Sequence, residues 1–276
     1  MSATLDPDVS AAVQELLTSV RVILGEHFRG MYLSGSLALG DFDPRRSDLD
    51  LVLITDADLT DTVFAALRDM HARFDAGDSP WATEVEVAYI PQDALYRHDA
   101  ARAYHPHLER GRTLVREQLD SGWVIQRHIL REHGIVVTGP ALKGLIGSIS
   151  VQDLRRATLE AFHGWWSPTL ERPGPFYHHG YQTYVVLTMC RVLYTLQRGT
   201  IASKQVAAHW AQERLGEPWT DLIERALIWR KASRGAELMP LTSAVVRETL
   251  DFIRYTRDRC QSTDADRGWR QIARGE

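Results

Sequence analysis

MYLSGSLALGDFDPRRSDLDLVLIT, residues 31–55, is the stretch that decides the fold. It predicts a strand, a turn of small residues at Gly35-Ser36, a polar loop and a second strand that begins with Asp48 and Asp50. Alternate residues of a strand point to the same face of a sheet. The carboxylates of Asp48 and Asp50 are therefore expected side by side.

Two adjacent carboxylates repel each other and are costly at the start of the apolar run 51–54. A hard divalent cation such as Mg²⁺ removes this repulsion because it prefers oxygen ligands. Gly35 lets the backbone approach a ligand closely, and Ser36 offers a hydroxyl and a backbone N–H to a phosphate. The stretch therefore predicts a site for Mg²⁺ and a phosphate. The alternative is a solvated turn followed by a core strand.

Length and composition favour a soluble protein of two domains. The chain has 276 residues, of which 44% are hydrophobic and 25% are charged, and this length can bury a large core. A net charge of −4 disfavours nucleic-acid binding, which usually needs a basic excess. The sequence has no apolar run that could span a membrane and no signal-peptide core at its start. We expect a cytoplasmic monomer in which Cys190 and Cys260 are reduced thiols.

The first domain, expected over residues 1–148, mixes helices with strands. Periodicity predicts helices over 9–28, 56–77 and 118–133, a strand over 83–90, and a short buried strand or turn over 134–140. Residues 91–113 show no clear period and are expected to be irregular.

A third carboxylate comes from the strand over 83–90, which places Glu84 and Glu86 on its polar face. If this strand pairs beside the strand of Asp50, Glu86 joins the two aspartates. The alternative for Glu86 is an exposed strand face. Glu84 is expected to be an exposed neighbour or a substrate contact.

The second domain, expected over residues 149–276, contains only helices. These are predicted over 151–164, with Ser150 as the N-cap, and over 180–197, 204–215, 220–232 and 242–259. Residues after Cys260 are polar and expected to be frayed. The fold class is therefore α+β, with a mixed sheet flanked by helices in the first domain and an all-α bundle in the second.

Two basic residues of the helical domain suggest an anion site. The helix from Gly180 is apolar except for a polar stripe of Tyr181, Tyr184, Thr188, Arg191 and Thr195. Arg191 in such surroundings needs an anionic partner, and Lys204 in a first helical turn opposes the helix dipole unless an anion is bound there. Both are placed to hold nucleotide phosphates across a cleft between the domains. An interhelical salt bridge for Arg191 and a plain surface lysine at 204 are the alternatives.

These motifs resemble a known family. Gly35-Ser36, then Ser47-Asp48-Leu49-Asp50, then an acidic residue on a later strand are similar to the motif of polymerase-β-type nucleotidyltransferases. VVLTMCR (185–191) and GTIASKQVAAHWAQERL (199–215) look like the helical-domain motif of the aminoglycoside 3''/9-adenylyltransferases, which act on streptomycin and spectinomycin. The resemblance covers about residues 10–255.

The resemblance implies roles for individual residues. Asp48 and Asp50 would bind Mg²⁺, and Glu86 would complete the carboxylate set as catalytic base. Nucleotide contacts are implied for Gly35, Ser36, Ser47, Arg191, Lys204 and Trp229. The reaction would transfer AMP from ATP to a hydroxyl of a small molecule, most simply an aminoglycoside-type antibiotic, with release of pyrophosphate.

One departure from the family pattern leaves the identity of the acceptor molecule open. An acidic residue shortly before the helical arginine helps hold the cationic antibiotic in the family, and Tyr181 occupies that position here. Glu84, Tyr181 and Tyr177 are the candidate substrate contacts. A nucleotide-binding regulatory or antitoxin-like protein and an adenylyltransferase that acts on a protein are the alternative functions.

Histidines and aromatic residues carry weaker signals. The spacings of His105, His107, His178 and His179 fit no common zinc site, so these are expected to be loop and surface histidines. Trp165, Trp166, Tyr177 and Tyr181 either line a substrate cleft or fill a core.

Overall fold

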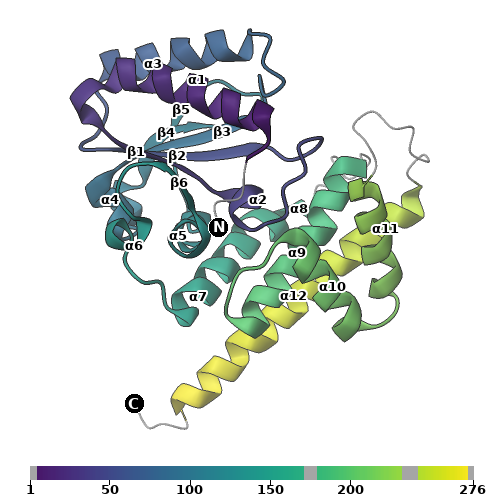
Figure 1. Ribbon diagram of the computed structural model, residues 1–276. Helices are drawn as coiled ribbons and strands as arrows, with labels where there is room; N and C mark the ends of the chain where they lie inside the picture. Colours follow the sequence, from purple (N-terminus) through teal and green to yellow (C-terminus); the bar gives the residue numbers. More distant parts are fainter. Residues whose placement is uncertain (1–4, 171–178, 232–241, 273–276) are drawn as a thin grey trace. The chain divides into compact units, whose positions relative to one another are not determined.

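The computed structural model describes residues 5–170, 179–231 and 242–272. The chain divides into two compact units, Met1–Ile149 and Ser150–Glu276, which run from purple to teal and from teal to yellow in Figure 1. The first contains a mixed sheet with helices, and the second contains helices. The predicted α+β fold class is therefore confirmed.

The sheet of the first unit has the strand order β5-β4-β3-β2-β1-β6. Its strands are β1 (Phe28–Leu33), β2 (Leu49–Thr55), β3 (Val85–Pro91), β4 (Tyr104–Leu108), β5 (Val115–Gln118) and β6 (Ile135–Thr138). The central pair β2–β3 is parallel, and the other neighbours are antiparallel. A parallel neighbour requires a crossover connection, which the segment between β2 and β3 provides.

Helices cover both faces of this sheet (Figure 1). The helices of the first unit are α1 (Pro7–Leu24), η1 (Gly25–His27), α2 (Gly35–Ala38), α3 (Asp61–Asp75), α4 (Gln92–Tyr96), η2 (Ala100–Arg102), α5 (Gly122–His133) and α6 (Leu142–Leu145). One hydrophobic cluster joins α1 and α3 to Leu51, Leu53 and Val87 of the sheet. A second cluster joins α5 and α6 to Val52 and Ala88 on the opposite face. The alternation of side chains along β2 and β3 thus divides the core into two layers.

Local capping explains where the two long helices of this layer begin. The Asp6 carboxylate accepts a hydrogen bond from the Asp8 N–H at 2.9 Å, and Pro7 occupies the first turn of α1. The Thr60 hydroxyl accepts from the Val63 N–H at 3.3 Å and caps α3. Both helices then bury an apolar stripe at helical spacing against the sheet.

The second unit is built around one long helix, α9 (His179–Arg198). The others are α7 (Val151–Ala161), η3 (Phe162–Trp166), α8 (Ser167–Thr169), α10 (Lys204–Leu215), α11 (Trp219–Lys231) and α12 (Ser243–Ile272). Ser150 caps α7, as predicted, by accepting from the Asp153 N–H at 3.0 Å. In the part of the chain that the structure describes, no helix is long and apolar enough to cross a membrane.

The core of this unit surrounds α9, whose side chains pack against α10, α11 and α12. The Thr249 hydroxyl of α12 donates to the buried Gln182 side chain of α9 at 2.9 Å. Cys190 and Cys260 lie in the same core with no exposed surface. Burial raises the pKa of the Cys190 thiol far above its usual value.

Three sequence predictions about elements are wrong. Residues 91–113 are not irregular, because α4, η2 and β4 lie in this range. Residues 135–138 form a strand, as predicted, but it is an edge strand in which Val136 is 46% exposed and not a buried one. The last helix does not end near Cys260 but continues to Ile272. The local pattern of 91–113 and of the residues after Cys260 is polar, whereas the place of 135–138 in the sheet decides its exposure.

A buried histidine links α3 to the sheet. His71 is 2% exposed, and its Nε2 lies 2.7 Å from the hydroxyl of Tyr89 on β3. Burial lowers the pKa of His71 from 6.5 to about 4. The folded chain therefore keeps the ring neutral in a range of pH where the unfolded chain protonates it.

We predict that stability falls as the pH drops from about 6.5 to about 4, because only the unfolded state binds the proton there. The free energy of unfolding should lose up to about 3 kcal/mol from this group. Urea denaturation of the wild type and of His71→Gln at several pH values measures it. The variant should show a shallower slope, whereas His133→Gln, which changes an exposed histidine, should keep the wild-type slope. Equal slopes for the wild type and His71→Gln would contradict the prediction.

Candidate functional site

The turn after β1 brings the backbone of Gly35 against the side chain of Asp50. Gly35 has a φ of 54°, in the left-handed region, and the Ser34 N–H donates to the Asp50 carbonyl at 3.0 Å. A Cβ at residue 35 would lie 1.7 Å from Asp50 Oδ2. Only glycine fits this contact with Asp50. The predicted approach of the Gly35 backbone to a ligand stays a prediction.

The loop between α2 and β2 is held by its own hydrogen bonds. The Asp43 N–H donates to the Ser47 hydroxyl at 3.1 Å, and the Ser47 N–H donates to the Asp43 carbonyl at 2.8 Å. The Arg46 guanidinium donates to the Asp43 carboxylate at 2.6 Å. Ser47 thus closes the loop that places Asp48. Its predicted phosphate contact stays a prediction.

β2 and β3 present their carboxylates at the same point. In the parallel register Asp50 pairs with Glu86, so both side chains lie on the same face. These two acids are the partly exposed residues of their strands, and the other residues of both strands are buried. The sequence expectation that β3 pairs beside the strand of Asp50 is therefore met.

The pKa of Glu86 is shifted by its burial and by nearby charges. Burial raises the pKa of Glu86, and the negative charge of Asp48 raises this pKa further. Asp48 thus lies close enough to Glu86 to affect its charge, Asp50 pairs with Glu86 in the strand register, and Gly35 packs against Asp50. Carboxylate oxygens are the donors that a hard divalent cation such as Mg²⁺ prefers.

Two hydroxyls beside this carboxylate group have no hydrogen-bond partner. They are the buried Oγ atoms of Ser34 and Ser36, which find no partner among residues 5–170, 179–231 and 242–272. Buried hydroxyls without partners are costly. The oxygen atoms of a bound phosphate would satisfy them, which suits the phosphate contact expected for Ser36.

Glu84 is not the exposed neighbour that the sequence predicted. Its side chain is 14% exposed, and Oε2 lies 2.7 Å from Nε of Arg110. Arg110 belongs to the connection between β4 and β5, which the sequence did not reveal. The ion pair explains why this carboxylate is covered.

The histidines of β4 also differ from expectation. His105 is 4% exposed, and burial lowers its pKa, while His107 is half-buried in the same strand. Neither is a loop or surface residue. His107, Glu109 and Glu117 approach one another, and sequence reasoning missed this cluster. The available signal was the alternation of His105, His107 and Glu109.

In the second unit, one side of α9 and the start of α10 carry the predicted polar residues. Tyr181, Thr188 and Arg191 are partly exposed and Tyr184 is exposed, but Thr195 is 2% exposed and does not belong to an open stripe. Lys204 is the first residue of α10, and its Nζ lies 4.8 Å from the centroid of the Tyr184 ring. This cation–π contact offsets part of the unfavourable helix dipole.

Of the remaining predicted residues, Trp229 lies on α11 and packs edge-on against the ring of His179, with centroids 4.6 Å apart. Tyr177 and His178 lie outside the described residues. Trp166 is 8% exposed and belongs to the core, whereas Trp165 is 64% exposed.

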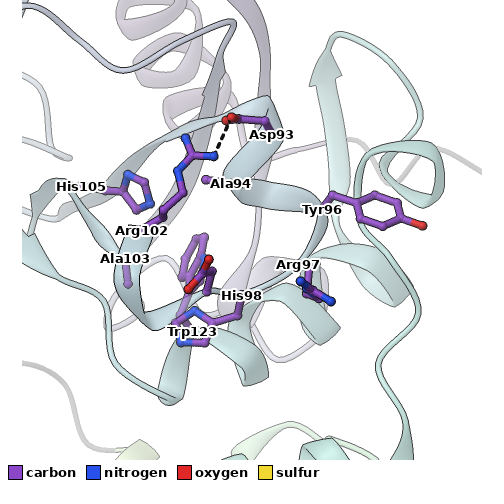
Figure 2. A pocket seen from close by; sticks show the side chains of 10 residues that line it. Asp93, Ala94, Tyr96, Arg97, His98, Arg102, Ala103, His105 and Trp123 are labelled. Carbon is purple, nitrogen blue, oxygen red and sulfur yellow. Dashed lines mark hydrogen bonds and ion pairs between the residues drawn. The ribbon is translucent and has the colours of Figure 1, made fainter.

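A pocket of the first unit lies away from the carboxylates. It has a volume of about 340 Å³ and is lined by Asp93, Ala94, Tyr96, Arg97, His98, Asp99, Arg102, Ala103, His105 and Trp123. Figure 2 shows the Arg102–Asp93 ion pair and the rings of His105 and Trp123 around it. α4 follows the carboxyl end of β3, whereas Glu86 is near the amino end. The predicted site residues are absent from this lining.

Comparisons with known proteins show which sequences this chain resembles. Residues 144–254 match the family model "Aminoglycoside adenylyltransferase, C-terminal domain". An aminoglycoside (3'') (9) adenylyltransferase of Escherichia coli is 29% identical over 91% of this chain and 94% of its own length. That of Klebsiella pneumoniae is 30% identical over 83% of this chain and 88% of its own length.

A solved structure has the same fold. It is the spectinomycin adenyltransferase AAD(9) from Enterococcus faecialis, crystallised with ATP and spectinomycin. The TM-score is 0.70 at 20% identity, and the match covers 90% of this chain and 98% of that chain.

We predict that Gly35→Ala weakens Mg²⁺ binding at the carboxylates, because the new Cβ must displace Asp50. Gly40→Ala is the matched control, since Gly40 also has a positive φ of 69° but has open space around its Cα. Both variants should lose about 1 kcal/mol of stability from the backbone. Only Gly35→Ala should lose more stability than this, as measured by thermal unfolding. It alone should also bind Mg²⁺ more weakly, as measured by calorimetry. Equal effects of the two substitutions would show that the Asp50 contact is unimportant.

Proposed function

The chain belongs to the aminoglycoside (3'') (9) adenylyltransferase family and is therefore an adenylyltransferase, and we propose that it transfers AMP from ATP to a hydroxyl of an aminoglycoside-type antibiotic, with release of pyrophosphate. The observation that carries this proposal is that Glu86 has Asp50 as its neighbour in the strand register and Asp48 as a nearby charge, while Gly35 contacts Asp50. A structural role alone gives no reason to place a partly buried glutamate beside two aspartates.

Asp48 and Asp50 would hold Mg²⁺, with Glu86 as the third oxygen donor of the group. When bound, the ion neutralises charge on the triphosphate and orients the α-phosphorus. Ser36 would donate its unpartnered hydroxyl to a phosphate oxygen, and Gly35 leaves room for that approach. Ser47 would add a further phosphate contact from the loop.

Glu86 would accept the proton of the acceptor hydroxyl. Its raised pKa makes it a stronger base than an exposed glutamate. The hydroxyl oxygen would then attack the α-phosphorus, and the bond to the leaving pyrophosphate would break. The acceptor must place its hydroxyl within hydrogen-bond reach of the Glu86 carboxylate.

The second unit would supply the positive charges. Arg191 and Lys204 would bind the β- and γ-phosphates and stabilise charge on the leaving pyrophosphate. Their placement on the open side of α9 and at the start of α10 supports this role, as does the family match over residues 144–254. Trp229 would stack near the adenine.

The acceptor would be less cationic than streptomycin. Tyr181 takes the place of the acidic residue that the family uses to hold a positive group, and its burial raises its own pKa, so it stays neutral. Spectinomycin 9-adenylyltransferase of Staphylococcus aureus is 24% identical over 85% of this chain. A spectinomycin-type acceptor is therefore the first to test.

We predict that Glu86→Gln lowers the rate of AMP transfer by about 100-fold or more, because it removes the base, while Mg-ATP still binds. Pyrophosphate release measures transfer, and calorimetry measures binding. The acid limb of the wild-type pH–rate profile should disappear in the variant, because glutamine does not titrate.

Glu84→Gln is the matched control, because that carboxylate already pairs with Arg110. It should retain most of the wild-type rate. Normal turnover by Glu86→Gln would show that the base is assigned wrongly. If Glu86→Gln loses both Mg-ATP binding and turnover, Glu86 acts as a metal ligand and not as the base.

A separate prediction concerns Tyr181. Tyr181→Asp should lower the KM for streptomycin about fivefold, because a partly exposed carboxylate–guanidinium pair contributes up to about 1 kcal/mol. Tyr181→Asn, which has nearly the same shape without the charge, is the control. Equal KM values for the two variants would mean that residue 181 does not contact the acceptor.

A further inference from the structure

The hairpin of β4 and β5 places three metal-binding side chains on one face. His107 and Glu109 are two residues apart along β4 and its extension, so they point to the same side. Glu117 pairs with His105, and His107 pairs with Val115, so Glu117 lies diagonal to His107 on that side. One ligand atom from each of the three residues lies within 4.8 Å of the other two.

From this geometry we propose that His107, Glu109 and Glu117 bind one divalent transition-metal ion of the zinc type. An imidazole nitrogen and two carboxylate oxygens are a common donor set for such ions. Donors around one ion lie about 3–4 Å apart when each bond is about 2 Å long. Small side-chain rotations therefore bring these three into coordination, and water completes the shell.

The present partners of the three side chains are easily replaced. Nδ1 of His107 lies in hydrogen-bond contact with the Glu117 carboxylate, and Glu109 forms an ion pair with Arg112 at 3.1 Å. The Arg112 side chain is 75% exposed, so this pair contributes little. An incoming ion would replace the His107–Glu117 contact and the Arg112 guanidinium, and it would bind the neutral imidazole.

The site differs from the carboxylate group of Asp48, Asp50 and Glu86 in its chemistry. Because β3 and β4 pair Val87 with Leu108, the next residues along are Glu86 and Glu109. The two groups are therefore neighbours, and their negative charges together attract cations. The imidazole of His107 distinguishes them, because Mg²⁺ strongly prefers oxygen whereas zinc and cobalt bind nitrogen well.

The test uses the full chain, stripped with a chelator and returned to millimolar Mg²⁺. Zinc is titrated by calorimetry, and cobalt is titrated by visible absorption as a spectroscopic probe. We expect one zinc ion per chain to bind in the presence of Mg²⁺. His107→Ala and Glu117→Gln should each weaken zinc binding by about tenfold or more.

Two control variants keep the test specific. His133→Ala removes an exposed histidine of α5 and should bind zinc like the wild type. Asp48→Asn should also keep the zinc site, because its change affects the other carboxylate group. Circular dichroism verifies folding, and Glu117→Gln serves if His107→Ala does not fold. Absence of zinc binding in Mg²⁺, or unchanged zinc affinity in the folded His107 and Glu117 variants, overturns the proposal.

Discussion

The burial of the strands that carry Asp50 and Glu86 is the constraint on which the candidate site of the first unit depends. The strands that carry Asp50 and Glu86 bury their other residues, so packing on both faces of the sheet fixes where those carboxylates lie. Each buried aliphatic side chain contributes about 1.5–3 kcal/mol, and together they hold an arrangement that charge alone would open. Gly35 completes it, because its missing Cβ leaves space for the Asp50 side chain.

In the second unit, too, buried residues hold the fold and accessible residues are the candidates for ligand binding. The buried side of α9 forms the core, while the opposite side leaves Tyr184 and Arg191 accessible. The N-cap of α10 and the Tyr184 ring give Lys204 a defined position at the start of a helix. Asp50, Glu86, Arg191 and Lys204 are therefore placed by strands and helices, whereas Asp48 lies at the end of the hydrogen-bonded loop before β2.

The sequence predicted the parts of the site that lie on strongly patterned segments. The apolar run after Asp50 and the alternation around Glu86 predicted two strands, and the small residues Gly35 and Ser36 predicted a turn before the first of them. The helices of the second unit were recognised from their period, with α10 matched at both ends. These signals are local, so a single sequence contains them.

The β4–β5 hairpin could not be predicted because its pattern is mostly polar and its partners are distant. Pro106 and the charged residues around it hide the alternation, and pairing with β3 supplies the stability that propensity does not. The cover that Arg110 gives to Glu84 depends on the same hairpin. The cluster of His107, Glu109 and Glu117 was missed for this reason.

The burial of Cys190 and Cys260 has a practical consequence. A thiol that is enclosed in a helical core reacts slowly with maleimides and with oxidants, and the raised pKa of Cys190 slows that residue further. A cysteine introduced at an exposed position, such as Val22 on α1 or Ile228 on α11, would then be the preferred target for a fluorescent dye. One dye on each unit would make the distance between the two units measurable in solution by energy transfer, with and without added ATP.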